Sequence, residues 1–176
     1  MKVRDLERLC AANGVGATKA DMVTRSLREV EELRVGGRGA NAPDANPEDA
    51  AKLLIALTGS STGKLAVDRL KVLSSLRSNK QKSATLLSRL TELLGGHEDL
   101  DRLVQCRIGR NIREAQFIFS DSKVEQFLLY SPKDYSERLR VEGVIPGAFL
   151  KNVARLIQEK ETFPATPSDI EEHDDS

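Results

Sequence analysis

The sequence has no tryptophan, and its five phenylalanines and two tyrosines all lie at Phe117 or beyond. A core in the first 94 residues must therefore consist of Leu, Val, Ala and Ile, which recur there at helical spacing. Alternation typical of β-strands begins near Val104. This change of pattern predicts a boundary near Gly95-Gly96, with helices before it and a sheet after it.

Residues that carry chemistry are also scarce. The two cysteines, Cys10 and Cys106, lie far apart in apolar surroundings, which favours buried thiols in a reducing compartment over a disulfide framework. The two histidines, His97 and His173, do not supply the parts of a hydrolytic triad or of a His-based zinc site. We therefore expect a protein that is not an enzyme and that holds no cofactor or metal.

Long apolar runs are missing too. No stretch approaches the roughly 18 apolar residues that span a bilayer, and the N-terminus lacks the charged-then-apolar pattern of a signal peptide. We expect a cytoplasmic protein without membrane association.

The whole chain has no excess of one charge sign, but its halves do. Lys and Arg number 27, as do Asp and Glu, which removes the simple argument for nucleic-acid binding from net charge. Residues 1–94 carry 16 basic and 11 acidic side chains, whereas residues 95–176 carry 11 and 16. Five acids of the second half lie between Asp169 and Asp175. The basic first half is therefore the part in which an anionic partner would bind.

These patterns predict an α+β fold: an all-α N-terminal domain, followed by a small antiparallel four-stranded sheet with one covering helix. We expect a first helix that ends near Asn13-Gly14. Further helices are expected over 19–33, 47–57, 62–77 and 82–94, and a last helix begins at Pro146. The expected strands lie around 104–108, 115–119, 124–130 and 139–144. The expected regions are 1–60 (DNA-binding), 61–95 (helical connector or oligomerisation), 96–161 (sheet plus helix) and 162–176 (disordered acidic tail).

The strongest functional pattern lies between Thr18 and Pro43. The segment Val23–Arg28 belongs to an amphipathic helix, and the glycine-rich segment Arg34–Arg38 follows it closely. Arginine can fork onto guanine or straddle phosphates, and glycine lets backbone amides approach an anionic strand. On the predicted helix, an apolar arc lies opposite a polar arc; the apolar residues are Met22, Val23, Leu27, Val30 and Leu33, and the polar ones are Thr24, Arg25 and Arg28.

This stretch resembles a winged helix-turn-helix protein, a family in which a recognition helix enters the major groove while a basic hairpin, the wing, reaches neighbouring phosphates or the minor groove. The resemblance covers about residues 18–43 and gives the N-terminal domain winged-helix character. The short helical N-terminus, the Gly-Arg-Gly loop and the acidic tail also resemble small phage or prophage proteins. The DNA contacts that the resemblance implies are Lys19, Thr24, Arg25, Arg28, Arg34, Gly37 and Arg38.

Other interpretations of the same residues stay open. Arg25 and Arg28 can be the solvated face of an ordinary helix, balanced by acids on that helix. Arg107, Arg110 and Arg113 form either a second phosphate or protein contact or a solvated turn.

The leading hypothesis is a sequence-specific duplex DNA-binding protein, a transcriptional regulator of phage or bacterial type. The Leu-rich helices expected over 62–77 and 82–94 would pair subunits of a homo-oligomer and bring two recognition helices to successive half-sites. The first alternative is a small terminase-like DNA-packaging subunit. The second is a protein-interaction adaptor or inhibitor that docks through its C-terminal domain and tail. A dimeric mass favours the regulator, and a ring of about eight or more subunits favours packaging.

Overall fold

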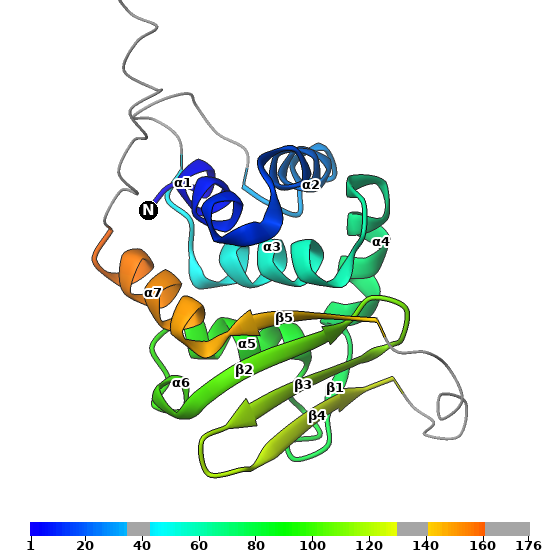
Figure 1. Cartoon of the computed structure of the whole chain (residues 1–176), viewed down its shortest axis with the longest axis vertical. Coiled ribbons are helices and arrows are strands. Elements are labelled where there is room, and N and C mark those ends of the chain that lie inside the picture. The colour runs from blue at the N-terminus through cyan, green and yellow to red at the C-terminus, as the bar shows by residue number, and fades with distance from the viewer. Residues whose placement is uncertain (35–42, 130–140, 161–176) are drawn as a thin grey trace, which may run out of the picture.

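The computed structural model describes residues 1–34, 43–129 and 141–160. Helices stack on one face of a five-stranded antiparallel sheet (Figure 1). None of the helices in these three ranges is long and apolar enough to cross a membrane. The larger helices are α1 (Val3–Cys10), α2 (Ala17–Glu29), α3 (Pro47–Gly59), α4 (Gly63–Ser74), α5 (Leu86–Leu94) and α7 (Gly147–Gln158), with a single turn at α6 (Asp99–Arg102). The strands are β1 (Arg77–Ser78), β2 (Leu103–Gly109), β3 (Glu114–Phe119), β4 (Val124–Leu128) and β5 (Glu142–Pro146).

The predicted mixture of helix and sheet is confirmed, and a few adjacent residues determine where several elements begin or turn. The Asn46 side chain accepts a hydrogen bond from the Asp49 N–H at 2.7 Å, and Pro47 is the first residue of α3. Ser122 has a φ of 62° in the tight turn between β3 and β4. Pro146 directly precedes α7.

The sheet has five strands, so the prediction of four was wrong by one. Its order is β1-β4-β3-β2-β5, and every neighbouring pair is antiparallel. The missed strand is β1, whose Arg77 and Ser78 pair with Leu128 and Phe127. Two residues are too few to show a strand period, and they follow an apolar helical pattern directly.

An irregularity in β2 turns Val104 outward. The register with β3 shifts between Leu103 and Gln105, so that Leu103 is buried while Val104 is 51% exposed. Cys106 and Ile108 point into the core as predicted. A bulge reverses the facing of the residues before it, which is why strict alternation placed Val104 on the wrong face.

Helix α3 is the central element of the molecule. It contacts α1, α2, α4, α5 and α7, and it also contacts β2 and β5. The inner face of the sheet is therefore covered by α3 as well as by α7, and not by one helix alone. Buried apolar side chains from Met1 to Leu156 form one cluster. The segments on either side of Gly95-Gly96 consequently pack against one another through α3.

Candidate nucleic-acid interface

Helices α1 and α2 form a pair joined by a turn over Ala11–Val15 (η1). Gly14 and Gly16 have φ values of 97° and 85°, a backbone conformation that favours glycine. A Cβ at either position would meet no atom within 4 Å, so the backbone conformation and not crowding selects glycine there. The turn reverses the chain so that α2 packs across α1, α3 and α4.

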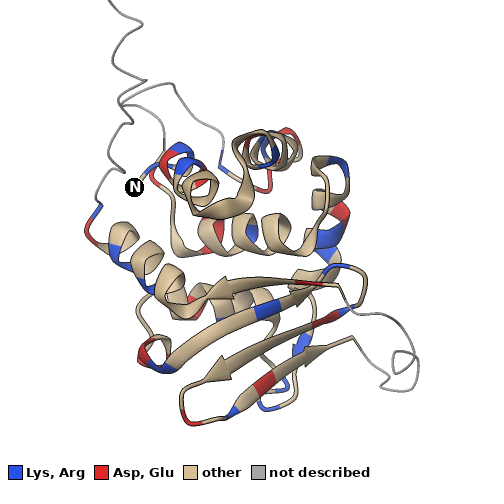
Figure 2. Ribbon diagram, viewed as in Figure 1, with Lys and Arg blue, Asp and Glu red and all other residues tan. Residues whose placement is uncertain are grey.

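The outward face of α2 carries charges of both signs. Its exposed residues are Ala17, Thr18, Asp21, Met22, Arg25 and Glu29. The Nη2 of Arg25 lies 2.9 Å from Oδ2 of Asp21, in an ion pair that leaves 69% of the Arg25 side chain exposed. Figure 2 shows basic and acidic residues interspersed along α1 to α4. Of the four predicted contacts on α2, only Arg25 points fully outward.

Thr24 does not lie on the exposed arc that the sequence predicts. It is only 1% exposed, while Met22 and Val30, expected on the apolar arc, are 48% and 46% exposed. The buried stripe of α2 runs through Ala20, Val23, Thr24 and Leu27, because helices cover two sides of α2. As placed, the Thr24 hydroxyl cannot reach a duplex.

Arg28 is half-buried, whereas the sequence places it near the centre of the exposed face of α2. Burial raises the pKa of the Glu7 carboxyl on α1, and the positive charge of Arg28 opposes that rise. Arg28 is therefore less accessible to a duplex than Arg25.

The two ends of the predicted wing segment are held by ion pairs. Arg34 donates from Nε and places Nη2 on the same Asp49 oxygen, each at 2.8 Å, with 47% of the Arg34 side chain exposed. On the other side, Lys2 and Asp44 form a backbone bridge and an ion pair of 3.1 Å. Gly37 and Arg38 lie outside the described residues.

Lys19 caps a helix instead of pointing into solvent. Its ammonium donates to the backbone carbonyls of Leu57 at 2.8 Å and Ser60 at 2.7 Å. These carbonyls belong to the end of α3, where unpaired oxygens form the negative pole of the helix dipole. Burial lowers the pKa of Lys19, and the neighbouring Arg110 lowers it further. Lys19 thus fixes the first turns of α2 against α3.

Arg69 and Arg110 complete this cap. The sequence pattern indicated Arg110 as a candidate contact but did not indicate Arg69. Arg69 Nε donates to the Gly59 carbonyl at 3.2 Å, and Arg110 Nε donates to the Thr58 carbonyl at 3.1 Å. Four successive carbonyls, 57–60, thus accept hydrogen bonds from three cations. The cations come from α2, α4 and the connection between β2 and β3, so no local spacing in the sequence indicates their meeting.

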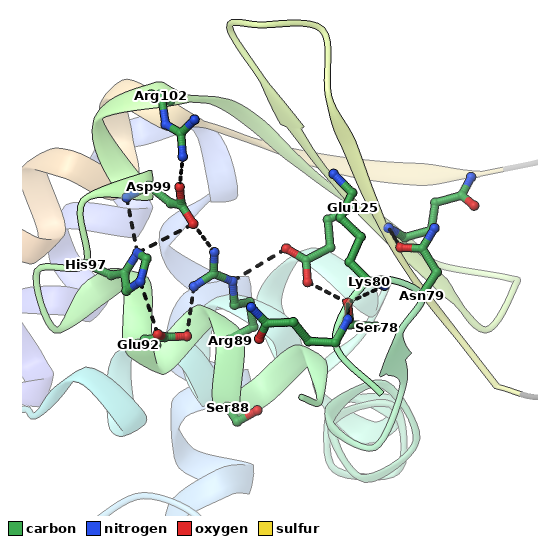
Figure 3. Close-up of polar contacts among 12 residues, drawn as sticks. Ser78, Asn79, Lys80, Ser88, Arg89, Glu92, His97, Asp99, Arg102 and Glu125 are labelled. Atoms are coloured by element: carbon green, nitrogen blue, oxygen red, sulfur yellow. Dashed lines mark hydrogen bonds and ion pairs between the residues drawn. The ribbon is translucent and has the colours of Figure 1, made fainter. Parts of the chain in front are cut away.

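A second polar cluster lies between α5, α6 and the sheet (Figure 3). The Arg89 side chain, 4% exposed, lies 2.8 Å from Glu92 and 3.5 Å from Glu125, and it also binds Asp99. The Ser78 hydroxyl donates to the other Glu125 oxygen at 2.6 Å. This network ties α5 to α6, β4 and β1.

The Arg89 cluster borders a pocket of about 150 Å³, whose lining includes Lys80, Arg102 and Lys123. Burial raises the pKa of Asp99, but hydrogen bonds from Arg89 and Arg102 outweigh that effect and hold the pKa below its ordinary value. The buried carboxylates are thus paired with cations and are not poised as free acids or bases. The cluster is an ion-pair network that joins elements of the fold.

No family model matches the chain, and no curated protein or solved structure is significantly similar to it.

Proposed function

We propose that the chain binds duplex DNA sequence-specifically and acts as a transcriptional regulator of phage or bacterial type. The observation that carries this proposal is the α1–α2 pair, whose second helix presents Arg25 on its outward face, while Asp44, further along the chain, bridges Lys2 at the start of α1. An exposed helix that projects an arginine can enter a major groove and fork onto guanine.

The anchored ends of residues 35–42 support a wing. Arg34 is held by Asp49, and Asp44 is held by Lys2. A segment with both ends fixed loses less conformational entropy on binding than a free tail. In this proposal, Arg38 contacts a phosphate, and Gly37 allows close approach of the backbone.

The remaining predicted contacts differ in their surroundings and therefore in their proposed roles. Arg25 reads base edges, while Arg28 and Arg34 contact phosphates with the nitrogens that their carboxylate neighbours leave free. Lys19 and Thr24 support α2 from inside, through the α3 cap and through burial.

Selection of bound sequences from random duplexes tests sequence reading. We expect enrichment of a short motif. Arg25→Ala should cost roughly 1–3 kcal/mol on that motif and much less on random DNA. Lys82→Ala removes the same charge from the exposed turn after β1 and should change neither affinity. Equal losses on both duplexes would make Arg25 a phosphate contact, and no enrichment would reject sequence-specific binding.

We also propose that the chain forms a homo-oligomer. Most of the leucines that suggested subunit pairing are buried within the chain, since Leu70, Leu73, Leu86 and Leu90 are at most 2% exposed. Leu65 of α4 is 48% exposed and is available to a second subunit. Sedimentation measures the mass: a dimer supports the regulator, and a ring of about eight or more subunits supports a terminase-like packaging role.

A protein-interaction role is the second candidate. The observation that favours it is a group of exposed valines on or beside the outward face of β2 and β5: Val104 at 51%, Val141 at 42% and Val144 at 52%. Failure of the chain to bind duplex DNA in a salt-sensitive way would favour this adaptor or inhibitor role.

A further inference from the structure

Four cationic side chains gather where α2, α4 and the β2–β3 connection meet the end of α3. Lys19, Arg69 and Arg110 share successive carbonyls at that helix end. Arg113 directly follows Ile112, whose carbonyl accepts a hydrogen bond from Arg69 at 3.0 Å, and burial together with the charge of Arg113 lowers the pKa of Arg69. In Figure 2, basic segments of α4 and of the β2–β3 connection lie next to one another.

Within residues 1–34, 43–129 and 141–160, no Asp or Glu forms an ion pair with any of the four cations of this basic cluster. The α3 carbonyls offset only about half an elementary charge, as the C-terminal pole of a helix does. By contrast, Arg89 is surrounded by three carboxylates. Within the described residues, the basic cluster therefore keeps a net positive charge of about three and a half, which attracts an anion.

The cluster presents two of its arginines outward on a fixed turn. Arg110 and Arg113 are exposed, and Arg110 uses only its Nε in the α3 cap. Arg69 Nη2 holds the turn by donating to the carbonyls of Gly109 at 2.6 Å and Ile112 at 3.0 Å. A Cβ on Gly109 would lie 2.4 Å from Ile112 Cγ1, so glycine permits this tight path. Arg110 and Arg113 thus stand on a turn that is clamped from below.

We infer that Arg110 and Arg113 contact phosphates of the duplex that receives α2, so that the C-terminal half of the chain takes part in DNA binding. This inference rests on the proposed function. Lys19 is the third residue of α2, and it donates to the same end of α3 as Arg110 does. The turn that carries Arg110 and Arg113 therefore lies beside the N-terminus of α2. Guanidinium groups without carboxylate partners fork onto phosphates, and a duplex offers about one charge per 1.7 Å.

Salt dependence of Arg113→Ala tests this inference, because Arg113 makes no hydrogen bond to a described residue that its loss would break. Removal of one phosphate contact should flatten the slope of log K against log salt by about 0.9. The ratio of wild-type to variant affinity should therefore fall about three- to fourfold between 50 and 200 mM salt, alike on random and selected duplexes. Arg107→Ala is the matched control, since Arg107 lies between the inward-facing Cys106 and Ile108 and so faces away from the helices.

The outcomes separate this inference from the proposed function. The inference would be overturned if Arg113→Ala and Arg110→Ala both kept the wild-type salt slope and affinity while Arg25→Ala lost affinity. DNA binding by α2 would then remain in place. An equal flattening by Arg107→Ala would also overturn it, because the effect would then follow total charge alone. Absence of duplex binding by the wild-type chain would reject the proposed function and this inference together.

Discussion

Replacement of Arg89 by methionine should destabilise the protein strongly while conserving most of the side-chain volume. The Arg89 side chain is 4% exposed, and its partner Glu125 is 5% exposed, whereas Glu92 is 47% exposed and can be rehydrated. Removing the cation therefore leaves the Glu125 charge buried, with Ser78 as its one hydrogen-bond donor among the described residues. Loss of one member of a buried ion pair costs about 3–5 kcal/mol, and we expect about 3 kcal/mol because part of the network reaches water.

Urea and thermal unfolding followed by circular dichroism measure this loss. For a chain of this size, about 3 kcal/mol corresponds to a fall in Tm of roughly 6–12 °C. The double variant Arg89→Met with Glu125→Leu removes both buried charges and should recover most of the lost stability. A loss below about 1 kcal/mol in Arg89→Met would refute the reasoning, as would a double variant that is destabilised by the sum of the two single changes.

Further predictions concern the thiols, a glycine and acid stability. Burial raises the pKa of Cys10 to about 12 and raises that of Cys106 as well, so neither thiol should react with a disulfide reagent at pH 8 until urea unfolds the chain; rapid labelling of the folded chain would contradict this. A Cβ on Gly147 would lie 1.9 Å from the Leu103 carbonyl oxygen, so Gly147→Ala should cost about 1–3 kcal/mol in urea unfolding, and an unchanged midpoint would be inconsistent with that contact. The lowered pKa of Asp99 stabilises the fold above the ordinary Asp value near 4. That stabilisation should disappear as the pH falls through the folded-state pKa, and Asp99→Asn should flatten the acid limb of a stability-against-pH curve.

Local signals in the sequence identified most elements, and they failed where a residue's neighbours come from distant segments. The α3 cap at Asn46 and the turn at Ser122 depend on a few adjacent residues, and both were predictable. Thr24 is buried because α2 packs against several other helices, which a pattern that ranks residues by polarity does not register. The alternating pattern placed Val104 on the wrong face for a related reason, because the bulge in β2 depends on the register with its partner strand.

The basic cluster was beyond prediction from spacing. Lys19 bonds residues 38 and 41 positions away, and Arg110 bonds one 52 positions away. The winged-helix resemblance implied that Lys19 is a DNA contact, whereas its hydrogen bonds at the end of α3 give it a capping role. No sequence pattern indicated a special role for Arg69, because an arginine in an amphipathic helix is ordinarily solvated.

The salt dependence of duplex binding by the wild-type chain tests the central claim most directly. The account assigns phosphate contacts to Arg28, Arg34, Arg38, Arg110 and Arg113, so log K should fall linearly with log salt, with a slope of about −4.5. Affinity for a labelled random duplex, read by fluorescence anisotropy, should then fall several hundredfold between 50 and 200 mM salt. Binding with a slope shallower than about −1, or no binding at 50 mM salt, would contradict the claim that this chain is a DNA-binding protein that uses these arginines.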